Sequence, residues 1–467
     1  MDLDASQKTT ATAETAPSRP RGGYGTGEAP TFDFYSKCIR CGLCLNSCPT
    51  YRELGWEMDS PRGRIYQIIQ VERGRLPLSE SFVKHIDLCL DCRACETACP
   101  SGVEYGRLVE AARGQIEKYY RRPFFDGLAR MLFLRGLLPH PGRLKLAGHL
   151  LGFYQRSGLE RLVLGSGILK LLPGRLADIA RLAPRIERPF FYDQLGTVHP
   201  AEGPRRYRVA FFAGCIANLA FARLNEATIR VLQRNGCDVV VPADQGCCGA
   251  LHVHAGMRDL ARELAKRNIQ TFLADGFDAI VTNAAGCGSV LKEYPLLFEE
   301  EQREVQESAK HFSSKLKDVT EFLAGIDLNP AFAVMNIRAT YQDPCHLGHA
   351  QRIRTAPRRL VAAIPGVQLI ELKESEICCG SAGIYNVVHN QMAEQLLAAK
   401  MQRIDETGAE VILTANPGCL LQLRAGAARA EKPRRVLHVV ELLDEAYGAA
   451  RPQGEETYGE PGGRRSE

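Results

Sequence analysis

The spacing of apolar residues changes along the chain and divides it into differently patterned parts. Apolar residues recur at helical spacing in 125–138, 144–155, 159–172 and 175–186, with prolines and glycines between these segments. From about residue 205, short apolar runs alternate with helical segments, and examples of these runs are 207–214, 237–242 and 277–283. This alternation predicts an α/β fold of βαβ type after residue 205, preceded by a helical connector.

The α/β region contains an internal repeat that its cysteines mark. Each half has a single cysteine, then a Cys-Cys-Gly (CCG) sequence, then another single cysteine, and matching cysteines lie 130 to 132 residues apart. The first half holds Cys215, Cys247, Cys248 and Cys287, and the second holds Cys345, Cys378, Cys379 and Cys419. Each half is expected to run strand, cysteine, helix, strand, CCG, helix, strand, cysteine, so the sequence predicts two copies of one α/β unit.

Composition narrows the chemistry of these cysteines. The 467 residues include 17 cysteines, and residues 1–30 have no apolar run of the kind that a secretion signal needs. We therefore expect a cytoplasmic protein whose thiols are reduced and serve as metal ligands or redox groups. A net charge of +5 is too small for a dedicated nucleic-acid binder, and the absence of a run of about 18 apolar residues predicts no transmembrane helix.

Two cysteine motifs between residues 31 and 120 are far more specific. The first is C-x2-C-x2-C-x3-C-P over 38–49, and the second is the same pattern over 89–100. This spacing is typical of bacterial ferredoxins with two [4Fe–4S] clusters, in which the fourth cysteine of each motif ligates the other cluster. The predicted ligand sets are Cys38, Cys41, Cys44 and Cys99 for one cluster and Cys89, Cys92, Cys95 and Cys48 for the other.

Zinc is the alternative, because two C-x2-C pairs can form a four-thiolate zinc site. Such sites usually take two cysteines from each of two loops rather than four from eleven residues that end in proline, so the spacing favours iron and sulfide. Four arginines near these loops could offset cluster charge, but a solvated surface position is the favoured interpretation for Arg40, Arg62, Arg64 and Arg93.

The cysteine pattern of the CCG halves resembles that of a known protein family. Their pattern, C-x31-CCG-x37-C and then C-x32-CCG-x38-C, resembles the cysteine-rich repeat of heterodisulfide reductase. With the ferredoxin motifs, and with the sequences DPCHLGHA (343–350), ICCGSAGIYN (377–386) and NPGC (416–419), residues 31–445 resemble the iron–sulfur subunit family of glycolate oxidase. The resemblance implies an electron-transfer subunit that takes electrons from FAD-containing partner subunits, which oxidise a 2-hydroxy acid such as glycolate, towards a quinone or similar acceptor. Relatives that serve lactate or glycerol-3-phosphate oxidation are alternatives.

One difference separates the chain from heterodisulfide reductase. That repeat ends in C-x2-C, whereas Val290 and Gln422 stand three residues after Cys287 and Cys419. Heterodisulfide chemistry is therefore the weaker alternative, and each half retains four cysteines. These could hold one or two additional clusters, or they could be buried thiols that pack against glycine turns.

Other residues receive structural interpretations. Cys237 has no counterpart in the second half and is expected to be a core thiol. Local structural roles are favoured over a cluster-adjacent or quinone-facing role for His252, His254, His346 and His349. The GSG at 165–167 does not support dinucleotide binding, and there is neither a Walker-type loop nor a convincing nucleophile–base pair. We therefore expect no catalytic residue in this chain.

The connector is unusually basic. Residues 121–188 contain thirteen lysines and arginines against four acids. A basic amphipathic helix can lie on an anionic membrane, which would place the protein peripherally on the inner face of the cell membrane. A solvated face of a helical linker is the alternative. The expected organisation is a disordered extension (1–30), a ferredoxin-type domain (31–120), the connector (121–204), two CCG repeats (205–325 and 326–449) and a disordered tail (450–467).

Overall fold

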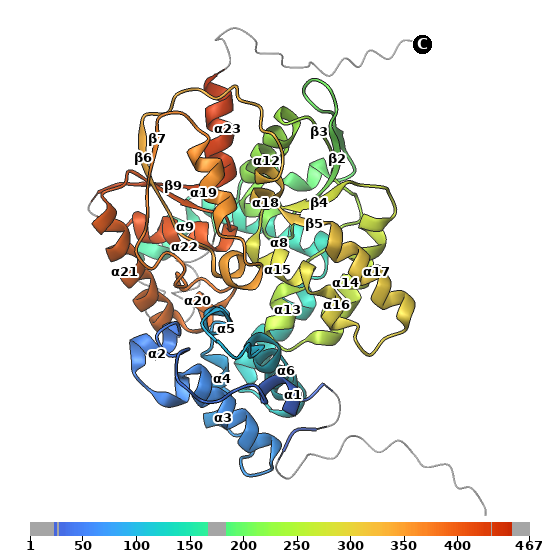
Figure 1. Ribbon diagram of the computed structural model, residues 1–467, viewed down its shortest axis with the longest axis vertical. Helices are drawn as coiled ribbons and strands as arrows, with labels where there is room; N and C mark the ends of the chain where they lie inside the picture. Colours follow the sequence, from blue (N-terminus) through green and yellow to red (C-terminus); the bar gives the residue numbers. More distant parts are fainter. Residues whose placement is uncertain (1–22, 26–27, 167–183, 431, 451–467) are drawn as a thin grey trace, which may run out of the picture.

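The computed structural model describes residues 23–25, 28–166, 184–430 and 432–450. The expectations for most of the two ends of the chain, and for the connector between 167 and 183, lie outside these residues. A helical module formed by the N-terminal part packs against two α/β halves, which lie side by side above it in Figure 1.

The N-terminal module is helical and encloses both ferredoxin motifs. Ser60 and Ser79 cap α3 and α4 by accepting hydrogen bonds from backbone N–H groups of their first turns, and the apolar faces of α3, α4 and α6 form one core. Its elements are α1 (Phe32–Tyr35), α2 (Pro49–Leu54), η1 (Glu57–Asp59), α3 (Pro61–Glu72), α4 (Glu80–Asp87), α5 (Ala94–Thr97) and α6 (Tyr105–Tyr119).

Residues just before the predicted ferredoxin domain also contact the protein. The backbone N–H of Gly25 donates to Gln115 Oε1 at 2.8 Å, and Glu28 pairs with Arg258 and Arg262. Within the described residues, contacts with the rest of the chain therefore begin before residue 31.

The described part of the connector is helical, as its apolar spacing predicts. It contains α7 (Phe124–Arg130), the π-helix η2 (Met131–Leu137), α8 (Pro141–Arg156), α9 (Leu159–Gly165) and η4 (Phe191–Gln194). Leu134, Leu138 and Leu144 pack with Leu219 and Met257 of the first α/β half, so the described connector is anchored on that half. No helix in the described ranges is long and apolar enough to cross a membrane.

The first half contains a five-stranded sheet in the order β1-β3-β2-β4-β5. Strands β2 to β5 are parallel, with Val209 of β2 opposite Val239 on one side and Ala279 on the other, whereas β1 joins β3 in antiparallel orientation. The strands are β1 (Val198–His199), β2 (Tyr207–Phe212), β3 (Cys237–Val240), β4 (Ala279–Thr282) and β5 (Leu316–Asp318). The helices are α11 (Ala217–Ala220), α12 (Ala222–Arg234), α13 (Ala250–His254), α14 (Arg258–Leu273), α15 (Ala285–Lys292), α16 (Tyr294–Leu297), α17 (Arg303–Lys315) and α18 (Val319–Ala324).

The second half contains a four-stranded parallel sheet in the order β7-β6-β8-β9. Ala339 of β6 faces Leu369 and Val411 of its two neighbours, which is the same arrangement as around Val209. The strands are β6 (Ile337–Tyr341), β7 (Val367–Ile370), β8 (Val411–Thr414) and β9 (Arg435–His438). The helices are η5 (His346–Ala350), α19 (Thr355–Ala362), α20 (Tyr385–Val388), α21 (Asn390–Thr407), α22 (Pro417–Ala427) and α23 (Val439–Ala449).

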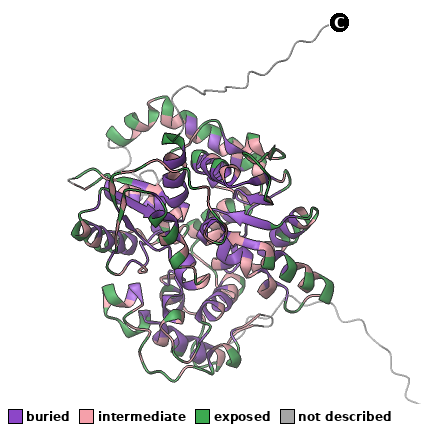
Figure 2. Ribbon diagram, turned by 45° about the horizontal axis from the view of Figure 1, so that its top comes forward, coloured by how far each residue is buried: buried purple, intermediate pink, exposed green. Residues whose placement is uncertain are grey.

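The two sheets confirm the predicted repeat and the predicted fold class. The order β3-β2-β4-β5 corresponds strand for strand to β7-β6-β8-β9, and each CCG sequence follows the matching strand. The central strands β4 and β8 are buried throughout, while the outward faces of the covering helices are exposed (Figure 2). Cys237 is fully buried in β3, which confirms its prediction as a core thiol.

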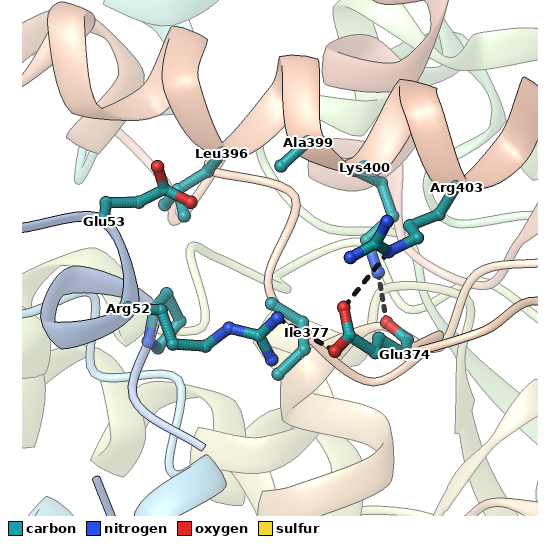
Figure 3. A pocket seen from close by; sticks show the side chains of 9 residues that line it. Arg52, Glu53, Glu374, Ile377, Leu396, Ala399, Lys400 and Arg403 are labelled. Atoms are coloured by element: carbon teal, nitrogen blue, oxygen red, sulfur yellow. Dashed lines mark hydrogen bonds and ion pairs between the residues drawn. The ribbon is translucent and has the colours of Figure 1, made fainter. Parts of the chain in front are cut away.

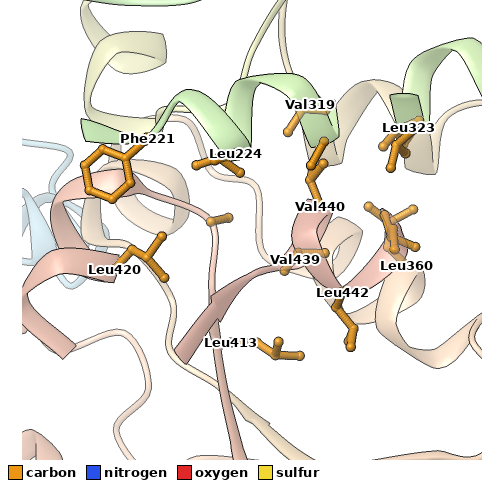
Figure 4. Packing of buried hydrophobic residues seen from close by; sticks show 14 of the residues in the cluster. Phe221, Leu224, Val319, Leu323, Leu360, Leu413, Leu420, Val439, Val440 and Leu442 are labelled. Atoms are coloured by element: carbon orange, nitrogen blue, oxygen red, sulfur yellow. The ribbon is translucent and has the colours of Figure 1, made fainter. Parts of the chain in front are cut away.

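One hydrophobic cluster belongs to both halves. Leu224 of α12, Val319 and Leu323 of α18, and Val440 and Leu442 of α23 lie within it (Figure 4). Arg230 of α12 and Asp444 of α23 form an ion pair at 2.7 Å at its edge. Because the halves share this core, we expect them to unfold together.

Truncating a central member of this cluster tests that expectation. Leu442→Ala should lower the free energy of unfolding by about 2–5 kcal/mol, since it removes a fully buried side chain and leaves a cavity. Circular dichroism in a urea titration should show one transition at lower denaturant. Val334→Ala, at a side chain that is 67% exposed, is the control and should leave the midpoint unchanged. Two separated transitions for Leu442→Ala would contradict a shared core.

Candidate iron–sulfur sites

The first ferredoxin loop lies near the surface. Arg40 and Gly42 have left-handed backbone conformations (φ 57° and 85°), which turn the chain tightly between its cysteines. Cys41 is exposed, whereas Cys38 and Cys44 are partly buried. Burial, with repulsion from the neighbouring thiols of Cys38 and Cys99, raises the pKa of Cys44 to about 11. The structure therefore brings Cys99 from the second motif beside the first loop.

The second loop is deeper in the protein. Cys89, Cys92 and Cys95 are buried together with Cys48 of the first motif, and all four line one internal cavity. Burial raises the pKa of Cys95, and repulsion from Cys92, Cys48 and Cys89 adds to the shift. Each fourth cysteine thus lies with the loop of the other motif, which is the arrangement expected for crossed ligation.

The donor chemistry of these sites fits [4Fe–4S] clusters. Four converging thiols offer the tetrathiolate set that such a cluster needs, and Cys48 and the second loop line one cavity. Buried thiols with raised pKa values stay protonated without a metal, so metal binding must release these protons. Binding at this site is consequently favoured by higher pH.

Two arginines near the loops are buried, so the surface interpretation is wrong for them. Arg64 is 1% exposed, and its Nη1 atom lies 3.9 Å from Cys48 Sγ and 3.1 Å from Thr50 Oγ1. Arg93 is 5% exposed and pairs with Glu110 and Glu293. Burying a guanidinium is costly unless its charge is compensated. Arg64 pairs with the buried carboxylate of Asp59 at 3.3 Å, and a thiolate-bound cluster would add negative charge beside it. Arg40 is exposed and Arg62 pairs with Glu57 near the surface, as predicted.

The first CCG half gathers its four cysteines. Cys215 Sγ lies 3.6 Å from Cys247 Sγ, and Cys248 contacts both Cys247 and Cys287. The hydrogen bond with Cys247, reinforced by burial, raises the pKa of Cys215. The cysteines follow the carboxyl ends of β2, β3 and β4, and these ends share one edge of a parallel sheet.

The second half repeats this arrangement after β6, β7 and β8. Cys345 Sγ lies 4.0 Å from Cys378 Sγ, and Cys379 hydrogen bonds with Cys378 and Cys419. These two bonds, aided by the nearby Lys400 ammonium, hold the pKa of Cys379 well below its usual range. Lys400 is itself buried and donates to the carbonyl oxygens of Glu374 and Ser375 at 2.6 and 3.1 Å.

The glycine of each CCG sequence makes this approach possible. Gly249 and Gly380 have φ values of +81° and +89°, which side chains with a Cβ rarely adopt. A Cβ on Gly380 would lie 2.6 Å from the backbone oxygen of Ala393. The turn therefore requires glycine, and it directs two successive cysteines towards the same site.

The deeper ferredoxin site and the second CCG site adjoin each other. Cys92 and Cys378 belong to one buried cluster with Cys345 at its edge, and burial, with repulsion from the Cys345 thiol, raises the pKa of Cys92. Hydrogen bonds tie the surrounding elements together: Tyr385 donates to the Leu88 carbonyl at 2.9 Å, and Thr97 Oγ1 lies 2.9 Å from His349 Nδ1.

A pocket opens at the same junction. Arg52 of α2 and Arg403 of α21 both pair with Glu374, at 2.8 and 3.3 Å, so this carboxylate links the N-terminal module to the second half (Figure 3). Pro49 and Ile377, which line the pocket, are the direct neighbours of Cys48 and Cys378 in the sequence.

The two CCG sites are also linked to each other. The backbone N–H of Gly286 donates to Asn416 Oδ1 at 3.2 Å, and Asn416 Nδ2 lies 3.4 Å from Cys419 Sγ. Ser289 Oγ lies 3.2 Å from His346 Nδ1. The helix that carries Cys287 therefore contacts residues beside Cys345 and Cys419.

The predicted structural histidines occupy these junctions. His252 Nε2 lies 2.8 Å from the Leu134 carbonyl, and His349 Nε2 lies 3.2 Å from the Glu376 carbonyl. His346 Nε2 lies 2.9 Å from the carbonyl of Asp91, which stands between Cys89 and Cys92. Burial lowers the pKa of His346 to about 4, so this ring is neutral.

A buried charge network joins the N-terminal module to the first half. His254 Nδ1 lies 3.1 Å from Asp91 Oδ2 and 3.1 Å from Glu110 Oε1, and Arg93 pairs with Glu110 and Glu293. Hydrogen bonds to the two carboxylates outweigh burial and raise the pKa of His254 to about 9. The sequence does not reveal this network, because its residues come from four separate segments, and only the position of Asp91 inside a cluster loop points to it.

Comparison with known proteins agrees with these sites. The family models that match are "4Fe-4S dicluster domain" over residues 35–103, "Glycolate oxidase iron-sulfur subunit, linker region" over 125–183, and "Cysteine-rich domain" over 209–292 and 339–424. The probable glycolate oxidase iron–sulfur subunit of Bacillus subtilis is 42% identical over 88% of this chain and 94% of its own length. The chain belongs to the glycolate oxidase iron–sulfur subunit family.

Other relatives share parts or all of this organisation. The glycolate oxidase iron–sulfur subunit of Escherichia coli is 32% identical over 88% of this chain and 93% of its own length. Lactate utilization protein A of a Geobacillus strain is 32% identical over 51% of this chain and 99% of its own length. As an iron–sulfur protein of this family, the chain carries [4Fe–4S] clusters rather than zinc.

Crossed ligation can be tested directly with two matched cysteine variants. Cys99→Ala should perturb the cluster of the Cys38 loop, because Cys99 lies beside Cys44, while the cluster of the Cys89 loop stays nearer intact. Cys48→Ala should have the opposite effect. Electron paramagnetic resonance of the two reduced variants makes the comparison. If each variant lost the signal of the loop in its own motif, crossed ligation would be wrong.

The charge network predicts a pH dependence of stability. Since the pKa of His254 is about 9 in the folded protein against 6.5 normally, its contribution is complete below pH 6.5 and is lost as the pH rises through about 9. His254→Gln should lower the midpoint of thermal unfolding at pH 6 more than at pH 10. His311→Gln, at an exposed histidine, is the control and should leave the profile unchanged. Equal losses at both pH values would show that the imidazolium is not needed.

Proposed function

We propose that this chain is the electron-transfer subunit of a 2-hydroxy-acid dehydrogenase, with glycolate as the substrate to test first. The observation that carries the proposal is that two thiol sets adjoin: Cys92 of the deeper ferredoxin site and Cys378 of the second CCG site belong to one buried cluster, against which Cys345 packs. Membership of the glycolate oxidase iron–sulfur subunit family supports the substrate class.

The arrangement of the sites supports a defined order of transfer. The two sets that we assign to the ferredoxin clusters are Cys38, Cys41, Cys44 with Cys99, and Cys89, Cys92, Cys95 with Cys48. Bound clusters would supply one-electron carriers, and the chain positions them. The exposed first loop suits entry from a partner, while the buried second loop passes electrons to the second CCG site.

Oxidation of the substrate is assigned to FAD-containing partner subunits, and a quinone or similar compound is the proposed acceptor. Hydride transfer is chemistry of the flavin, so the role of this chain is to accept single electrons and pass them on. The names of the relatives support this division, since they describe iron–sulfur subunits of glycolate oxidase.

We also propose that each CCG half can hold a further cluster. The thiols of each half meet in one place, and the neighbouring Asn416 and Lys400 favour the charged form of the second set. The ferredoxin sites account for about eight iron atoms per chain, so anaerobically prepared protein should contain clearly more.

Lactate is the second candidate substrate, because Lactate utilization protein A matches half of the chain over nearly its full length. Heterodisulfide reduction is less favoured, because Val290 and Gln422 replace the last cysteine of that pattern.

The double variant Cys378→Ala with Cys379→Ala tests the route. In the complex with its co-purified flavoprotein subunits, glycolate should still reduce the flavin and both ferredoxin clusters, while iron per chain falls and onward transfer to a water-soluble quinone is slowed at least about tenfold. Iron analysis, electron paramagnetic resonance and quinone reduction measure these effects. Cys237→Ala, at a core thiol outside the sites, is the control. Unchanged quinone reduction would end the proposed route at the ferredoxin module, and glycolate oxidation by the pure chain alone would overturn the carrier role.

A further inference from the structure

The connector helix α8 turns small residues towards the protein and large apolar residues towards solvent. Its inward positions are Leu144, Gly148 and Gly152. A Cβ on Gly148 would lie 2.7 Å from Leu219, and one on Gly152 would lie 3.2 Å from Ile186. Gly148 therefore lets α8 lie close against the first half, Gly152 lets it lie close against Ile186 of the connector, and the large side chains of α8 are left on the opposite face.

That outward face is apolar. Leu146, Leu150 and Phe153 lie on one stripe at spacings of four and three residues, and they are 60%, 64% and 65% exposed. Leu162 of the neighbouring helix α9 is 69% exposed. A helix on a water-exposed surface normally presents polar side chains outward, so this stripe points to an apolar environment outside the protein.

The exposed charges beside the stripe are mainly positive. Over 121–166 and 184–188, every exposed charged residue is an arginine: Arg121, Arg135, Arg143, Arg156, Arg161, Arg185 and Arg188. The exposed acids farther along the connector are paired, Asp193 with Lys145 of α8 at 3.0 Å and Glu202 with Arg234 at 2.9 Å. Arg143 and Arg156 lie near the two ends of the α8 stripe, and Arg161 adjoins Leu162. The acids Asp126, Glu160 and Glu187 are only partly exposed.

We propose that the face formed by Leu146, Leu150, Phe153 and Leu162 docks on an anionic lipid bilayer, with the arginines at the level of the headgroups. Leucine and phenylalanine side chains enter the boundary between headgroups and acyl chains, and arginines pair with lipid phosphates. A bilayer fits better than a protein groove, because the unpaired exposed charge beside the stripe is carried by arginines, which suits the surface of an anionic membrane. Lipid docking is independent of the proposed electron transfer, although it would bring a membrane-dissolved acceptor close to the chain.

Flotation with lipid vesicles tests this docking on the full chain with its clusters. Binding to phosphatidylglycerol-containing vesicles should exceed binding to pure phosphatidylcholine vesicles and should fall steeply with salt. The triple variant Arg143→Gln, Arg156→Gln and Arg161→Gln should bind on the order of a hundredfold more weakly, because each arginine close to an anionic surface strengthens binding roughly fivefold. Leu146→Gln with Leu150→Gln and Phe153→Gln should lose the binding that persists at high salt.

Exposed residues outside the connector provide matched controls. Arg303→Gln, Arg338→Gln and Arg359→Gln remove the same charge elsewhere, and Val334→Gln changes an exposed apolar residue; neither should alter vesicle binding. Absence of binding by the unaltered protein, or equal binding by the connector and control variants, would overturn the proposal. If the unaltered protein did not bind vesicles, and the leucine and phenylalanine variant no longer co-purified with its flavoprotein subunits, the face would be a protein interface instead.

Discussion

Mutual repulsion between buried thiolates is the constraint on which the rest of this structure depends. Four thiols that meet in a protein interior cannot all ionise unless a metal compensates their charge. The chain creates this situation in the cavity of Cys48, Cys89, Cys92 and Cys95, and again at each CCG half. Burial and repulsion raise the pKa of Cys95, and the hydrogen bond with Cys247, together with burial and repulsion, raises the pKa of Cys215. Bound clusters would therefore contribute to folding stability as well as to electron transfer.

The α/β halves deliver their cysteines by a simple geometric means. The carboxyl ends of parallel strands share one edge of a sheet, so cysteines that follow three neighbouring strands meet at that edge. The positive φ values of Gly249 and Gly380 then direct two successive cysteines to the same point. Duplicating the unit and packing α12 against α23 places the two sites close to each other around a shared core.

Charged side chains at the junctions between the parts of the protein complement the negative charge expected at the cysteine sites. Arg64 beside Cys48 and Lys400 beside Cys379 are cations held where thiolate charge accumulates. His254, Asp91, Glu110 and Arg93 form a compensated network next to the deeper loop, and it links that loop to the first half. Buried ions of this kind are tolerated because each has a partner of opposite charge, and removing one partner would be costly.

The sequence by itself determined the cluster type, the repeat and the family. The C-x2-C-x2-C-x3-C-P spacing is a local property, because three cysteines that wrap one cluster must be close in sequence. The near-constant offset between matching cysteines likewise shows that the α/β unit is duplicated, and this can be seen in the sequence alone. The helical spacing of apolar residues predicted the helices of the connector, because a 3.6-residue repeat can be recognised from residues that are close in sequence.

Tertiary structure decided what depends on segments far apart in the chain. Arg64 and Arg93 resemble surface arginines in sequence, and only packing shows that they are buried. The partners of His254 come from residues 91 and 110, and the neighbour of Cys92 is Cys345; no local pattern encodes such distances. The outward direction of Leu150 and Phe153 was likewise fixed by packing, because Gly148 and Gly152 take the inward face of α8. Periodicity places an apolar stripe on a helix, but the surface against which the helix packs decides whether that stripe is buried or exposed.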